Sequence, residues 1–103
     1  MIHFNQETFE QALQDGKLML VDFWASWCGP CMMLGPVIES LAENYQDKAV
    51  IGKVNTDEES ELAISYGVSN IPTVIFFKDG KEIDRLVGVM PPDAFIQVLE
   101  ENL

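Results

Sequence analysis

Basic residues are scarce in this sequence of 103 residues, which has six lysines and arginines against 17 acidic residues and a formal charge of −11. A surface of this sign repels phosphate groups, so nucleic acids and anionic membranes are disfavoured as partners. Apolar runs are also short. The longest, such as 18–21 and 74–77, have four residues, whereas a membrane-spanning helix needs about 20.

Targeting signals and cysteines are equally sparse. The first six residues, MIHFNQ, lack the basic and apolar blocks of a signal peptide, so we expect a cytoplasmic protein. The two cysteines are too few for the multi-disulfide scaffold of a small secreted domain. There is no repeat, low-complexity tract or flexible linker, and the length suits one domain spanning residues 1–103.

Helix and strand patterns alternate along the chain. Asn5 is a suitable N-cap and Gly16 a suitable stop for a first helix. Apolar residues with helical spacing indicate a long helix after Pro30, a short one at 57–66 and a last one after 91–92. Strands are expected at 18–24, 49–55, 73–77 and 81–87, with a short one at 2–4, and Asp79-Gly80 predicts a hairpin. This order predicts a mixed sheet with helices on both faces, a three-layer α/β sandwich.

The segment Trp27-Cys28-Gly29-Pro30-Cys31 lies between a buried strand and the first turn of the long helix. Side chains three residues apart in a helix are neighbours, so Cys28 and Cys31 can close a disulfide across one turn. Free N–H groups and the dipole at this helix end favour a thiolate at Cys28, the form that attacks a disulfide. Gly29 leaves the sulfur accessible, and Pro30 suits the first turn. Cys31 is expected to be shielded until it resolves a mixed disulfide.

The cysteine pair has two other interpretations. A zinc site normally needs four ligands, and the only further soft ligand, His3, is far along the chain; we therefore expect no metal. A purely structural disulfide is uncommon in a cytosolic protein, and a four-residue loop constrains the unfolded chain little. Redox catalysis is the favoured interpretation.

Asp22 interrupts the apolar strand at 18–24, and two interpretations of it stay open. Burial on both faces would raise its pKa and make it a proton acceptor for Cys31. Alternatively, it lies on an exposed strand face, since alternation groups residues 20, 22 and 24 without saying which face they occupy. Pro72, in Ile71-Pro72-Thr73, is allowed at the start of a strand, where a cis bond is a minority state.

Together these residues resemble the thioredoxin family over essentially the whole chain. The matching segments are Val21-Asp22-Phe23-Trp24-Ala25, Trp27-Cys28-Gly29-Pro30-Cys31, Pro36, Lys53-Val54-Asn55 with Asp57, Tyr66-Gly67-Val68, Ile71-Pro72-Thr73, Phe77-Lys78-Asp79-Gly80 and Val87-Gly88. A bare CxxC is a weak signal, whereas WCGPC with these flanking matches is specific. The resemblance implies one thioredoxin domain over 1–103, with a five-stranded mixed sheet and four helices in α/β/α layers.

The resemblance also implies an activity, protein-disulfide reduction by dithiol–disulfide exchange. Cys28 would be the nucleophile and Cys31 the resolving cysteine of a redox disulfide, with Asp22 buried beneath Cys31 and Lys53 near it. The Ile71–Pro72 bond would be cis and face the sulfurs. The family's target-contact positions are Trp27, Gly29, Pro30, Ile71, Pro72, Gly88 and Val89. Trp27 is expected to be exposed, whereas Val87 is expected to point inward.

The implied partners are disulfide-containing target proteins and a thioredoxin reductase. The chain itself is expected to bind no cofactor, since it has no glycine-rich phosphate loop, and to be a monomer. Met32 and Met33 follow the second cysteine, where many family members carry a lysine. This difference makes the surface around the cysteines more apolar. Two other functions are compatible with this fold. One is a periplasmic-type oxidase or isomerase, which Gly-Pro between the cysteines disfavours, and the other is a docking module that needs no turnover. Asp22, Pro72 and both cysteines together favour catalysis.

Overall fold

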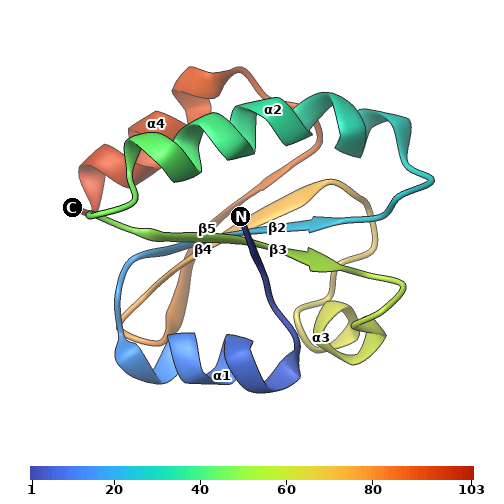
Figure 1. Cartoon of the computed structure of the whole chain (residues 1–103), viewed down its shortest axis with the longest axis horizontal. Coiled ribbons are helices and arrows are strands. Elements are labelled where there is room, and N and C mark those ends of the chain that lie inside the picture. Colours follow the sequence, from blue (N-terminus) through green and yellow to red (C-terminus); the bar gives the residue numbers. More distant parts are fainter.

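A five-stranded mixed sheet forms the centre of the protein, whose computed structural model describes all residues from 1 to 103 (Figure 1). The strands lie in the order β1-β3-β2-β4-β5 and span Ile2–His3 (β1), Val50–Asn55 (β3), Met19–Trp24 (β2), Thr73–Lys78 (β4) and Lys81–Val87 (β5). Strands β1, β3 and β2 are parallel, whereas β4 and β5 run antiparallel to their neighbours. The sheet is therefore mixed, as the sequence predicts.

Four helices cover the two faces of this sheet and complete the predicted three-layer sandwich. They are α1 (Gln6–Asp15), α2 (Gly29–Asn44), α3 (Ser60–Ser65) and α4 (Pro92–Glu101). Figure 1 shows α2 and α4 together on one face, with α1 and α3 on the other. No helix has the length and apolar character that crossing a membrane requires.

Strand β2 divides its side chains between two cores. Leu20, together with Leu18 just before the strand, belongs to the cluster that also contains residues of α2 and α4. Met19 and Val21 belong to the opposite cluster, with residues of α1 and α3. Because side chains alternate along a strand, Asp22 lies on the same face as Leu20, beneath α2. This assignment fixes the face that the sequence left open.

Several local predictions are confirmed. The Asn5 side chain accepts the N–H of Thr8 at 2.9 Å, and Gly16 ends α1 with φ of 71°. Asp79 and Gly80 both have positive φ, 55° and 78°, which is the backbone that a tight hairpin requires.

Two predictions are wrong. The short helix expected at 57–66 begins only at Ser60, because the Asn55 side chain accepts the N–H groups of Asp57 and Glu58 at 2.9 and 3.3 Å and holds them in a turn. Val87 does not point inward but is 51% exposed, since it ends β5 at the open edge of the sheet.

Candidate active site

The two cysteines lie where β2 has ended and α2 begins. Cys28 is the N-cap of α2 and is joined to Cys31 by a disulfide, with the two Cα atoms 5.2 Å apart. The backbone N–H of Cys31 donates to Cys28 Sγ at 3.2 Å. In the reduced protein, the same N–H and the positive end of the helix dipole would stabilise a thiolate at Cys28.

Both cysteines are largely shielded from solvent. Cys28 is 6% exposed and Cys31 is 2% exposed, and the pair packs with Ala25, Trp24 and Ile71. The shielding predicted for Cys31 is therefore present. In the oxidised form it extends to Cys28, which leaves only a small edge of the disulfide accessible to a partner.

A second loop faces the disulfide. The Ile71–Pro72 bond is cis, and the carbonyl oxygen of Ile71 lies 3.8 Å from Cys28 Sγ. The N–H of Gly88 donates to the carbonyl of Pro72 at 2.8 Å, so the 88–89 segment is fastened beside this loop. Gly88 has a φ of 89°, a conformation that glycine adopts without strain. Val89, next to it, is 46% exposed.

Trp27 directly precedes Cys28 in the active-site turn. Its side chain is 71% exposed, as expected, and its indole N–H donates to Asp57 Oδ2 at 2.8 Å. This hydrogen bond ties the active-site turn to the loop between β3 and α3. The sequence assigns Asp57 no role, because nothing in it pairs this residue with Trp27, 30 positions away.

Asp22 is fully buried on the face of the sheet that α2 covers. Neither carboxylate oxygen has a hydrogen-bond partner within the protein. Burial raises the pKa of Asp22 to about 6, and the charge of Lys53 offsets part of this effect. The alternative of an exposed strand face is therefore wrong, and the carboxyl titrates close to neutral pH.

Lys53 is the partner of Asp22 in the register of β2 and β3. Its Nζ lies 5.2 Å from the centre of the Trp24 ring. Gly35 of α2 lies close to Lys53, since a Cβ on that glycine would be in ordinary van der Waals contact with Nζ, at 3.6 Å. This proximity of α2 and Lys53 could not be predicted from the sequence, because a glycine within a helix has no single meaning.

Among the histidine, cysteine and acidic side chains, no group of three or more is arranged to hold a metal ion. The site brings together the Cys28–Cys31 disulfide at the start of α2 and the buried carboxyl of Asp22 on the sheet face that α2 covers. The disulfide lies at the amino end of a helix, exposes a small edge to solvent and has a buried carboxyl beneath it. These features define the class of dithiol–disulfide oxidoreductases.

Comparison with known proteins gives the family. The family model described as Thioredoxin matches residues 1–101. The thioredoxin of Chlorobaculum thiosulfatiphilum is 50% identical over 93 residues, which cover 90% of this chain and 86% of the relative. Thioredoxin 1 of Nostoc sp. is 45% identical over 97 residues, covering 93% and 91% of the two chains.

Solved structures agree. A thioredoxin from Plasmodium falciparum superposes with a TM-score of 0.91 at 32% identity and covers 100% of both chains. A mutant thioredoxin from Halobacterium salinarum NRC-1 gives 0.89 at 39% identity, covering 97% of this chain and 88% of that one. The chain belongs to the thioredoxin family.

Proposed function

We propose that this protein reduces disulfides of other proteins, with Cys28 as the nucleophile and Cys31 as the resolving cysteine. The Cys28 thiolate attacks one sulfur of the target disulfide, forms a mixed disulfide and releases the other sulfur as a thiolate. Cys31 then attacks Cys28 Sγ, which releases the reduced target and leaves the Cys28–Cys31 disulfide. The observation that carries this proposal is the position of Cys28 Sγ at the N-cap, where it accepts the Cys31 N–H.

In this proposal Asp22 takes the proton of Cys31 during the second step. A carboxyl with a pKa of about 6 is largely ionised at neutral pH, so it can accept a proton and readily return it. Lys53 acts as a positioning residue, since its charge keeps the pKa of Asp22 from rising further. The shared face of the sheet and α2 supports this role for both residues.

Target binding is proposed for the rim around the disulfide, formed by Trp27, Gly29, Pro30, Ile71, Pro72, Gly88 and Val89. Trp27 and Val89 offer exposed apolar surface on this rim. The segment at Ile71 precedes β4 and can pair its backbone with an extended stretch of a target, which gives affinity with little sequence selection.

The partners follow from this chemistry. Each turnover leaves the protein oxidised, so a reductase must supply two electrons before the next one. We propose that a thioredoxin reductase does so, that a single thioredoxin domain of residues 1–103 works as a monomer without a bound cofactor, and that the protein acts in the cytoplasm, where thiols are kept reduced.

Insulin reduction with dithiothreitol as electron donor tests the proposal. The wild-type protein should accelerate the precipitation of reduced insulin well beyond dithiothreitol alone, and Cys28→Ser should abolish the acceleration. A wild-type rate no higher than that of dithiothreitol would refute a general reductase and favour a docking role instead.

A further inference from the structure

The stretch of sequence that carries the disulfide contains no charged residue and exposes several large apolar side chains. Residues 23–38 include the whole active-site turn and the first half of α2, and none of them is charged. Within this stretch Trp27 and Met33 are each 71% exposed, and Met32 is 55% exposed. Methionine side chains adapt to differently shaped partners, so this rim makes few demands on the apolar part of a target.

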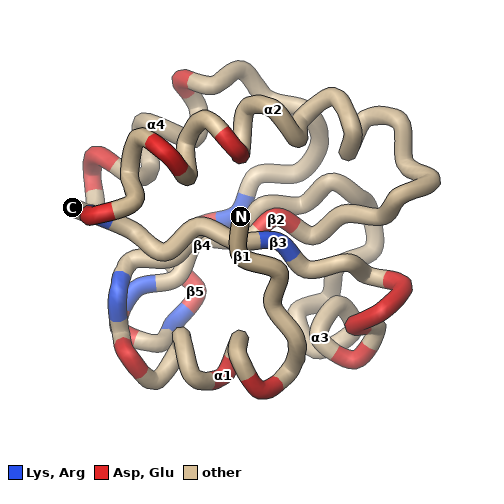
Figure 2. The backbone as a smooth tube through the Cα atoms, viewed as in Figure 1, with Lys and Arg blue, Asp and Glu red and all other residues tan.

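The charged residues in the neighbouring segment, which follows β3, are acidic. Asp57 is hydrogen bonded to Trp27, and Glu58, Glu59 and Glu61 follow it in the loop and the start of α3. The other segments that meet at the same end of the sheet, 25–28, 66–72 and 88–91, contain no lysine or arginine. Figure 2 shows acidic residues but no basic ones along the loops at the active-site end.

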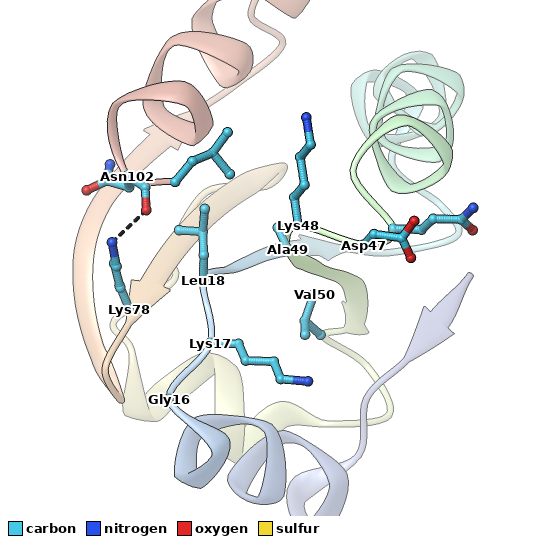
Figure 3. Close-up of a pocket in the computed structure, with 11 residues that line it drawn as sticks. Gly16, Lys17, Leu18, Asp47, Lys48, Ala49, Val50, Lys78 and Asn102 are labelled. Atoms are coloured by element: carbon cyan, nitrogen blue, oxygen red, sulfur yellow. Dashed lines mark hydrogen bonds between the residues drawn. The ribbon is translucent and has the colours of Figure 1, made fainter.

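The basic residues gather elsewhere. Three of the six, Lys17, Lys48 and Lys78, line one hollow at the opposite end of the sheet, where β2 and β3 begin (Figure 3). Strand β2 has six residues, so about 20 Å of strand separates the two ends at ~3.3 Å per residue.

None of the other three basic residues offers an unpaired, exposed charge at the active site. Arg85 is paired with Glu82 at 2.7 Å. Lys53 is half-buried against the ring of Trp24, and Lys81 lies at the start of β5, the edge strand. The active-site end therefore combines an apolar rim with uncompensated negative charge.

We propose that this charge distribution makes the redox disulfide selective for target disulfides flanked by basic residues. The inference rests on the proposed function and names the class of target. A lysine or arginine beside the target disulfide would meet carboxylates on the Asp57 side and apolar surface at Met32 and Met33. Complementary charge raises the association rate, whereas an acidic flank would meet repulsion with no cation to offset it.

Two synthetic peptides, each with one disulfide and identical except for lysine or glutamate flanks, test this selectivity. At low salt, kcat/KM should be about tenfold higher for the lysine peptide, and the ratio should fall toward one at high salt, because screening removes it. Equal values at low salt would overturn the inference while leaving the reductase intact. Reduction of neither peptide, nor of insulin, would instead refute the proposed function.

Matched variants separate local charge from the overall charge of −11. The double variant Glu58→Gln with Glu61→Gln should lower the ratio severalfold. Glu43→Gln with Glu101→Gln makes the same change in charge on exposed residues of α2 and α4 and should leave the ratio unchanged. Equal effects of the two double variants would overturn the local assignment.

A single substitution tests the same idea from the opposite direction. Met32→Lys adds a cation to the exposed rim and should raise kcat/KM for the glutamate peptide relative to the lysine peptide. A peptide with uncharged flanks serves as the internal control for folding and catalysis in every variant. No change in the ratio with Met32→Lys would contradict the proposal.

Discussion

Replacing Asp22 by asparagine should stabilise the folded protein at neutral pH. Asp22 is fully buried without a hydrogen-bond partner, so its ionisation is opposed by the fold. Asparagine has nearly the shape of the protonated carboxyl and carries no charge. The variant therefore removes the cost of ionisation while changing the packing little.

The pKa of Asp22 gives the size of this effect. It is raised from 3.8 to about 6, chiefly by burial, and this difference corresponds to about 3 kcal/mol. The folded protein binds the proton more tightly than the unfolded chain does. The cost is therefore absent below about pH 3.8, grows as the pH rises toward 6 and is complete above that.

The cost of ionising Asp22 is measured by guanidinium chloride unfolding of the wild-type and variant proteins, both in the oxidised form, at pH 3.5 and pH 8. The gain in the free energy of unfolding from Asp22→Asn should be about 3 kcal/mol larger at pH 8. Asp47→Asn, at an exposed position, is the control and should change stability by less than about 0.5 kcal/mol at either pH. A gain for Asp22→Asn that is the same at both pH values would refute the reasoning.

Three further predictions concern single positions. Lys53→Met removes the cation that lowers the pKa of Asp22, so carbon-13 NMR titration of the carboxyl should give a pKa above the wild-type value of about 6; an unchanged pKa would contradict the assignment. Gly52→Ala puts a Cβ 2.5 Å from the ring of Phe4 and should cost about 1–3 kcal/mol in chemical unfolding, whereas a neutral effect would mean that the ring moves freely. Asn5→Ala removes the side-chain cap of α1 and should lower the free energy of unfolding by about 1 kcal/mol; an unchanged free energy of unfolding would contradict a stabilising cap.

Much of the fold could be predicted from the sequence because the local signals agree with one another. The cap at Asn5, the stop at Gly16 and the turn at Asp79-Gly80 are all confirmed. The position of the cysteine pair at a helix start is confirmed as well. Each of these features depends on neighbouring residues, which a sequence displays directly.

The parts that could not be predicted depend on contacts between distant residues. Strand alternation groups Asp22 with Leu20 but says nothing about which helices cover that face, so the burial of the carboxyl needed the structure. The late start of α3 depends on a side-chain turn at Asn55. The exposure of Val87 follows from the edge position of β5, which only the strand order reveals.

The most direct test of the central claim is to trap the mixed disulfide. Reduced Cys31→Ser, lacking the resolving sulfur, should form a stable covalent adduct with a disulfide-containing protein, and mass spectrometry should locate the bond at Cys28. Reduced Cys28→Ser, which keeps only the shielded sulfur, should form almost no adduct in the same time. Equal trapping by both variants, or trapping by Cys28→Ser alone, would contradict the assignment of Cys28 as the nucleophile.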